Sequence, residues 1–418
     1  MAIRSHDSLI AAPAELAAAL RLTTELLAME LAAPTEQPPD WTSSKWAVAR
    51  AAVTIHGIAG LLLRDLRWPG MPGWYDFLER ETAETRERER RAVSALADID
   101  AAARAAGIPL VALKGHALLA LGMYEPGERP MADIDLLVRP RDRIALERVM
   151  ASMGFAAVSV SWKHWEFARP LSGSAAAGEV GLDAIKVDVH QRLAEQISDF
   201  EIEMPGDLFG TDPGTGVRGY PSRPILLRHL LMHTAANMST RWVRAVHLSD
   251  IARVASGLTP AEWAETLPRH WTHSWCLLPP LALVARYFPG VVPPDLVAQV
   301  EVACPRGLAR AVRRQVLTDL SASDPRFRAL PAFDWCTSLP GVLRYMKRRV
   351  LPGRSELRSL AGIARTTGFA RDNRWFTMSQ PARIMQWVFR RPMRPATLHA
   401  VRVEFARKAV TPVGEPRQ

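Results

Sequence analysis

Cysteine is scarce in this chain, and its scarcity excludes two kinds of scaffold. Cys276, Cys304 and Cys336 are the only cysteines among 418 residues. An odd number of widely spaced cysteines fits neither a disulfide framework nor the closely spaced pairs of a zinc motif. We therefore expect neither a disulfide-stapled domain nor a cysteine-bound zinc ion.

Long hydrophobic runs are also missing. No stretch of 18 or more apolar residues occurs, so we do not expect a membrane-spanning helix. Residues 1–7 lack the apolar core and the small-residue cleavage site of a signal peptide. The composition, 48% hydrophobic and 23% charged, is that of an ordinary globular protein. We therefore expect a cytoplasmic protein with a sizeable core and two domains or subdomains.

Acidic residues are scarce in the last part of the chain. From Gly341 onward there are 17 Arg and Lys against 4 Asp and Glu, while the whole chain has a formal charge of +10. Such a basic region favours contact with phosphate, RNA or an acidic partner. An equally good interpretation is that these arginines only cover solvated helix faces.

Apolar residues at helical spacing dominate both ends of the chain. Near the N-terminus they predict helices at 8–32, from residue 44, and at 73–106. The helical pattern returns from residue 224. The predicted organisation is a helical region at 1–106, a central core at 107–222, a helical region at 223–409 that is basic after 341, and a disordered tail at 410–418.

Short apolar runs replace the helical pattern in the central core and indicate strands. Small residues at 171–178 are typical of a hairpin tip or a mobile loop. The predicted elements are a strand at 108–113, a helix at 117–123, a strand at 132–138, a helix at 142–153, a strand at 154–160 that could continue at 161–167 as an edge strand, and a strand at 185–190.

Two aspartates one residue apart, Asp133 and Asp135, are the most informative feature of the core. Alternate residues of a strand point to the same side, so both carboxylates face away from their apolar neighbours Ile134 and Leu136. Two anions side by side repel each other, and a cation between them relieves this repulsion. Hard oxygen ligands favour Mg²⁺ or Mn²⁺. The pair therefore predicts a metal-dependent enzyme.

A third carboxylate is expected from the strand at 185–190. Its residues alternate strictly, which places Lys186, Asp188 and His190 on the face opposite the apolar side chains. Asp188 would then complete a set of three metal ligands. Asp183 is a nearby alternative that strand periodicity does not exclude.

The order of these elements resembles a known core. It consists of a strand, a Lys-Gly turn, a helix, the Asp-x-Asp strand, a helix and strand, and a later strand with another aspartate. The matching residues are Leu113-Lys-Gly115, Arg129 with Asp133–Val138, Gly154-Phe155, Val187–His190, and the helical stretch Leu226–Val254 with His233, Arg244 and Ser249–Ala252. This pattern resembles the DNA polymerase β-like nucleotidyltransferase superfamily and looks most like its bacterial family of uncharacterised nucleotidyltransferases.

The resemblance covers about residues 45–260. It implies an α+β fold in which a small mixed sheet carries the active site between helical regions. In-line nucleotidyl transfer uses one metal ion at the triphosphate and another at the attacking hydroxyl. Asp133 and Asp135 would bridge the two ions. Asp188 would complete the site of the catalytic ion and accept the hydroxyl proton.

Nucleotide-binding residues are expected around this metal site. The Gly115 turn would bring backbone N–H groups and a helix N-terminus to the phosphates. Lys114 and Arg129 would neutralise phosphate charge, although a loop arginine such as Arg129 is also often solvated. Many members of the superfamily carry Gly-Ser at this turn, so their serine contact to the nucleotide does not apply to this chain.

We also expect roles for three histidines and for an Arg–Asp pair on a helix. His190 would orient Asp188 or contact the acceptor. Arg244 is expected near the site, paired with Asp250 as structural support. His229 and His233 lie four residues apart, as zinc-binding pairs do, but packed polar histidines are the preferred interpretation because no acidic ligand accompanies them.

Three functions fit these patterns. The first is transfer of a nucleoside monophosphate from ATP or another nucleoside triphosphate to an acceptor hydroxyl of a small molecule, protein or RNA. The second is a kinase on the same fold, because both reactions place the same demands on metal and triphosphate. The third is a catalytically silent nucleotide-binding module. Alanine at position 133 or 135 is predicted to abolish turnover and leave the fold intact.

Overall fold

The computed structural model describes residues 12–170, 184–210, 214–268, 271–353, 375, 378–389 and 392–410. Three sequence expectations lie outside these residues. They are the loop at 171–178, the alternative ligand Asp183, and the tail, except for its first residue, Val410.

Six strands form one mixed sheet in the order β3-β4-β5-β2-β1-β8. Strand β2 pairs in parallel with β5 and antiparallel with β1, and β1 pairs in parallel with β8. A separate two-stranded sheet joins β6 and β7. The strands are β1 (Pro109–Ala112), β2 (Ile134–Val138), β3 (Ala156–Val160), β4 (His164–Pro170), β5 (Ala184–His190), β6 (Ala194–Ile197), β7 (Phe200–Glu203) and β8 (Gly216–Arg218).

The two faces of the large sheet have different roles. One face is apolar and packs on α4 (Trp74–Ala105) and α6 (Arg143–Ser152). Alternate residues of β2 and β5 enter this core, among them Ile134, Leu136 and Val187. The opposite face carries the aspartates, and α5 (Lys114–Ala120) contacts β2. The alternation of apolar and acidic residues therefore decides which side of the sheet can hold a polar site.

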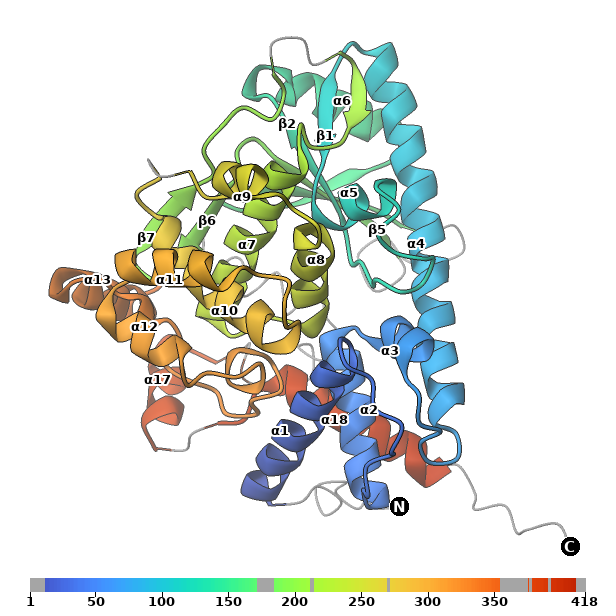
Figure 1. Cartoon of the computed structure of the whole chain (residues 1–418). Helices are drawn as coiled ribbons and strands as arrows, with labels where there is room; N and C mark the ends of the chain where they lie inside the picture. Colours follow the sequence, from blue (N-terminus) through green and yellow to red (C-terminus); the bar gives the residue numbers. More distant parts are fainter. Residues whose placement is uncertain are drawn as a thin grey trace, which may run out of the picture.

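The N-terminal helices are α1 (Pro13–Glu30), α2 (Ser43–His56), α3 (Ala59–Asp65) and α4. Helix α4 runs from these helices at one end of the molecule to the sheet at the other (Figure 1). Four tryptophans, Trp41, Trp46, Trp68 and Trp74, pack together with ring centroids 5.0 to 6.0 Å apart. These tryptophans belong to the hydrophobic core.

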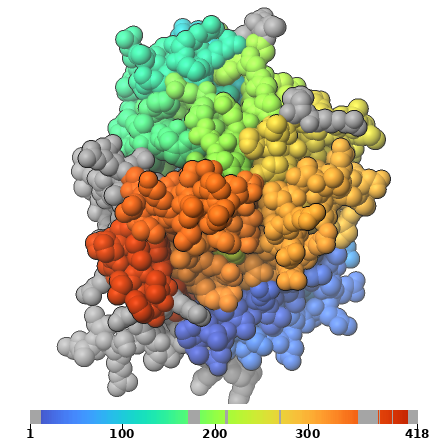
Figure 2. Space-filling model, turned by 90° about the vertical axis from the view of Figure 1, so that its left-hand side faces the viewer, coloured from blue at the N-terminus to red at the C-terminus, as the bar shows by residue number. Residues whose placement is uncertain are grey.

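The C-terminal region is helical, as expected, and returns to the N-terminal helices. Helix α18 packs beside α2 at the end of the molecule away from the sheet (Figure 1). In Figure 2, residues of the C-terminal region form the middle of one face, between the sheet region above and the N-terminal helices below. Its helices are α7 (Arg223–Thr240), α8 (Ala245–Ala255), α9 (Pro260–Thr266), α10 (Leu278–Tyr287), α11 (Pro294–Ala303), α12 (Arg306–Val312), α13 (Leu339–Val350), α17 (Gln380–Phe389) and α18 (Pro395–Val410).

The expected α+β class is confirmed, but two local predictions are wrong. The segment expected as an edge continuation of β3 is a separate strand, β4, which lies inside the sheet between β3 and β5. The helix expected from Ala117 begins at Lys114 and ends at Ala120. Lys114 has φ +48°, so the chain turns sharply from β1 directly into α5.

No single helix in the described part of the chain is both long and apolar enough to cross a membrane, although α2 and α3 together, bent by 112°, meet the same length and composition test.

Candidate active site

Two neighbouring strands bring the predicted carboxylates together. In the parallel pair β2–β5, Asp135 lies directly opposite Asp188. Paired residues of adjacent strands point to the same face. Asp133 lies in the bend just before β2, two residues from Asp135, because the strand predicted at 132–138 begins at Ile134. The pairing therefore places Asp135 beside Asp188. Asp133 is close enough to both to raise the pKa of Asp188 and to have its own pKa raised by Asp135.

Asp135 already has partners within the protein. Lys114 Nζ lies 2.8 Å from Asp135 Oδ1, and His190 Nε2 lies 3.1 Å from the same oxygen. Burial alone would lower the pKa of Lys114, but the carboxylates of Asp135 and Asp133 raise it above its usual range. The lysine is therefore held as a charged group at the centre of the site.

The three carboxylates differ in how far nearby cationic and hydrogen-bonding groups stabilise their negative charge. Burial and repulsion from Asp133 and Asp135 raise the pKa of Asp188 to about 8. Burial and Asp135 raise the pKa of Asp133 to about 6. Burial opposes ionisation of Asp135 as well, but Lys114 and His190 hold its pKa well below the usual range. Asp188 is thus largely protonated at pH 7, and a cation beside Asp133 and Asp188 would stabilise the ionised form of both.

The first turn of α5 is packed against Arg129. A Cβ atom on Gly115 would lie 2.3 Å from Arg129 Nη1 and 2.6 Å from Met131 Sδ. Arg129 is fixed by two hydrogen bonds to Asp250, of 2.8 and 2.7 Å, and Tyr124 donates a third to this carboxylate at 2.7 Å. Glycine at 115 therefore allows the buried guanidinium to lie directly against the Lys114 turn.

Arg244 does not pair with Asp250 as expected, because Asp250 binds Arg129 instead. Arg244 is the N-cap residue of α8, and its Nε donates to the carbonyl oxygen of Ile55 at 3.1 Å. Gly57, with φ +63°, lies beside it, and a Cβ there would be 2.0 Å from the guanidinium. Burial, with Arg129 nearby, lowers the pKa of Arg244 to about 10.

His164 is a site residue that the sequence analysis missed. Its Nε2 lies 3.2 Å from Asp188 Oδ2, and strand pairing sets it opposite His190. Burial, with help from His190, lowers the pKa of His164 to about 3, so its imidazole is neutral at pH 7. The sequence signal is the alternation of polar residues in 164–166. This signal identifies His164 as a site residue only if 164–170 is a strand of its own that pairs with β5.

A second buried polar group follows β5. Glu195 accepts hydrogen bonds from Lys163 at 2.6 Å and from His233 at 2.9 Å. Burial would raise the pKa of Glu195, but these two partners lower it below the usual range. His229 is bonded to the Tyr220 hydroxyl at 2.5 Å. His229 and His233 thus have separate polar partners, as expected of packed histidines.

A cavity of about 620 Å³ opens beside Asp133. Its volume is within the range of pockets that hold small-molecule ligands. Asp133 and Lys186 line it from the sheet side. The helical regions contribute charged side chains of both signs: Arg88, Arg91, Arg244 and Arg407, with Glu81, Glu84 and Glu404.

The fold and the site together define an α+β protein with a buried cluster of carboxylates, histidines and a lysine on one face of a mixed sheet. A family model described as an uncharacterised nucleotidyltransferase matches residues 42–288, which is more than half of the chain. The chain belongs to this nucleotidyltransferase family, and the resemblance drawn from its motifs is confirmed. No curated protein and no solved structure matches the chain.

Proposed function

We propose that this protein transfers a nucleoside monophosphate from a nucleoside triphosphate to an acceptor hydroxyl and releases pyrophosphate. The family supports nucleotidyl transfer in general. The observation that carries the specific proposal is the register of β2 and β5, which sets Asp135 opposite Asp188 with Asp133 two residues away.

The donor set fits Mg²⁺ or Mn²⁺ at Asp133, Asp135 and Asp188. The fit rests on the raised pKa values of Asp133 and Asp188, because burial and mutual repulsion disfavour their ionised forms and a nearby cation would stabilise those forms. When bound, divalent ions neutralise the triphosphate and lower the pKa of the attacking hydroxyl. Asp188 is proposed as the group that takes the hydroxyl proton.

Lys114 and the residues around it are proposed to bind the triphosphate. The Lys114 ammonium binds Asp135 on the sheet face where the phosphates would lie. The same ammonium group can therefore contact Asp135 and a phosphate oxygen. Arg129 is engaged by Asp250 and therefore acts by fixing the Lys114–Gly115 turn. His190 holds Asp135 from the other side and so positions this carboxylate.

The cavity beside Asp133 is proposed to take the substrates. Arg88, Arg91 and Arg244 are proposed to contact phosphates or an acidic acceptor. Arg407 is paired with Glu81 and Glu404, which line the cavity as well. All described strands lie between residues 109 and 218. We accordingly propose 107–222 as the catalytic core, flanked by the helical regions 1–106 and 223–409.

Labelled triphosphates test this function directly. The full-length protein is incubated with Mg²⁺ or Mn²⁺, a cell extract, and each of the four nucleoside triphosphates labelled at either the α or the γ phosphate. We expect label from the α position on an acceptor, together with pyrophosphate. Label from the γ position alone would show a kinase, and label from neither position with any nucleotide would overturn the proposal.

A matched pair of variants assigns the reaction to this site. Asp188→Asn removes the proposed proton acceptor, and we expect a loss of at least about 10³-fold in the rate. Asp98→Asn makes the same change at an exposed position on α4 and should leave the rate unchanged. Equal rates for the two variants would show that Asp188 does not take part in the reaction.

A further inference from the structure

We propose that His164, Asp188 and His190 bind a divalent transition-metal ion through two imidazole nitrogens and one carboxylate oxygen. This inference deepens the proposed function and rests on it for the catalytic role of the ion. It differs from the three-carboxylate site because it adds nitrogen ligands, one of them from a strand that contributes no aspartate.

The donor atoms are close enough to share one ion. One ligand atom from each of the three residues lies within 4.8 Å of the others. His164 Nε2 is 3.2 Å from Asp188 Oδ2, and the two imidazole centroids are 5.1 Å apart. Two donors bonded to one ion at about 2.1 Å lie about 3 Å apart at right angles and at most about 4.2 Å apart, so the 3.2 Å pair already fits and any wider pair must close on the ion.

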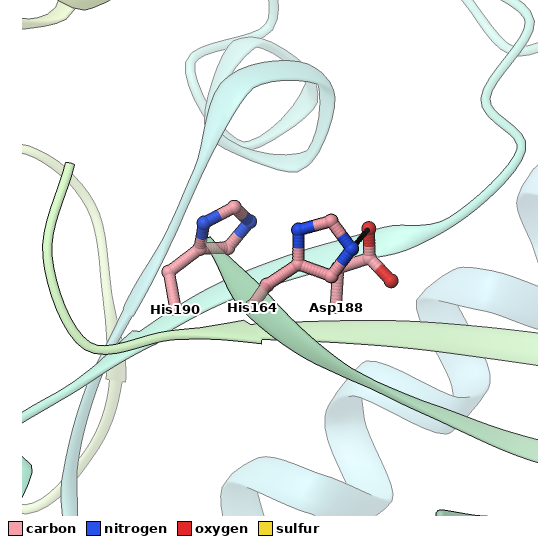
Figure 3. A group of neighbouring side chains, drawn as sticks. All are labelled: His164, Asp188 and His190. Atoms are coloured by element: carbon pink, nitrogen blue, oxygen red, sulfur yellow. Dashed lines mark ion pairs between the residues drawn. The ribbon is translucent and has the colours of Figure 1, made fainter. Parts of the chain in front are cut away.

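Each ring can give one nitrogen to an ion, and its Nε2 already faces a carboxylate, Asp188 for His164 and Asp135 for His190. Nδ1 of His164 and Nδ1 of His190 are buried and have no hydrogen-bond partner among the described residues. A buried polar atom without a partner costs about 1–3 kcal/mol, which a ligand can offset. In Figure 3 the two rings lie next to each other, tilted by 50°, with a nitrogen of each turned toward the other ring and Asp188 on the other side of His164.

Two imidazole nitrogens and one carboxylate oxygen favour some divalent ions over others. Neutral imidazole suits Mn²⁺, Fe²⁺, Co²⁺ and Zn²⁺, whereas Mg²⁺ prefers oxygen ligands and keeps much of its water. His164 and His190 lie on adjacent strands, opposite each other, so the sheet holds both rings in place before an ion binds. The site is therefore expected to favour transition metals over Mg²⁺.

Metal binding without nucleotide tests the inference. The full-length protein is stripped of metal and titrated with Co²⁺, Mn²⁺ and Mg²⁺ by calorimetry, and the Co²⁺ absorption spectrum is followed in parallel. We expect Co²⁺ to bind at least about 100-fold more tightly than Mg²⁺. Pulsed electron paramagnetic resonance of bound Mn²⁺ should show coupling to imidazole nitrogen.

Three variants separate ligation from a merely structural role. His164→Gln can still hydrogen-bond Asp188 but has no imidazole, and should weaken Co²⁺ binding at least about tenfold and reduce the nitrogen coupling. His273→Gln, a histidine stacked on Phe200 near the small sheet, should bind Co²⁺ as the parent does. Asp133→Asn should also keep the nitrogen coupling, because Asp133 is not in this set.

The outcomes distinguish this inference from the proposed function. Equal affinity for Co²⁺ and Mg²⁺, or unchanged nitrogen coupling in His164→Gln, would overturn the histidine site even if nucleotidyl transfer is observed. Nitrogen coupling that depends on His164 would support the site even if no triphosphate is ever consumed.

Discussion

At the scale of single residues, the two aspartates of the Asp-x-Asp pair are chemically different. The sequence alone predicts the same behaviour for both, because they share a strand face. The structure gives Asp135 two partners, Lys114 and His190, while no hydrogen bond to the Asp133 side chain is found in the described part of the chain. Their replacement should therefore have different effects on stability.

We expect Asp133→Asn to keep or slightly raise the free energy of unfolding, because it removes a carboxylate that repels Asp135. Asp135→Asn should lower it by about 3 kcal/mol, because it leaves the Lys114 ammonium buried without its counter-ion. Both variants should lose nucleotidyl transfer. Urea unfolding checks the difference, and equal stabilities for the two variants would contradict this division of roles.

At the scale of elements, the close contact between α5 and Arg129 predicts the effect of one methyl group. In Gly115→Ala the added Cβ must displace both the Met131 side chain and the Arg129 guanidinium, which Asp250 holds with two hydrogen bonds. We expect a loss of about 1–3 kcal/mol in unfolding free energy. A lower affinity for triphosphate should accompany it.

Gly307→Ala is the matched control, since no atom lies within 4 Å of its Cβ position on α12. This change should leave stability unaltered or raise it slightly, because alanine favours helix. Nucleotide affinity is measured by calorimetry for both variants. A Gly115→Ala protein with parental stability and affinity would show that the Arg129 contact is not needed.

The positions of β1, β2, β3 and β5 were predicted from the sequence to within a few residues, but those of β6, β7 and β8 were not, and neither were strand order and pairing. The alternation of apolar residues in 185–190 predicted strand β5 and placed Asp188 on the face opposite the apolar core. The structure agrees with both predictions. The turn between β3 and β4 was missed because residues 161–163 contain no glycine, proline, asparagine or aspartate, so 161–167 was expected to continue β3 at the sheet edge. His164 entered the site only through the pairing of β4 with β5, which depends on contacts distant in sequence.

At the scale of the whole molecule, His56 connects three parts of the chain. It ends α2, its Nδ1 accepts a hydrogen bond from the backbone N–H of Ala245 in α8 at 3.0 Å, and its Nε2 bonds Ser323 at 2.9 Å. Ser323 in turn bonds Thr24 of α1 at 2.9 Å. A proton on His56 Nδ1 would break the bond to α8 and place a charge in the core.

This arrangement predicts instability in acid. Burial, with Arg244 nearby, lowers the pKa of His56 to about 3 from its ordinary value of 6.5. Below pH 6.5 the unfolded chain binds a proton that the folded protein does not, so the stability is present above pH 6.5 and is lost as pH falls toward 3. From pH 7 to pH 5 we expect this histidine alone to remove about 2 kcal/mol of unfolding free energy.

Urea unfolding at several pH values measures this loss, and His56→Gln isolates it. Glutamine cannot take up a proton, so this variant should be less stable at pH 8, where the Ala245 N–H loses its acceptor, but should depend less on pH between 7 and 5. The remaining slope would come from other buried histidines such as His116, whose pKa burial lowers to about 4. A variant whose slope equals that of the parent would show that His56 is not the group that destabilises the protein in acid.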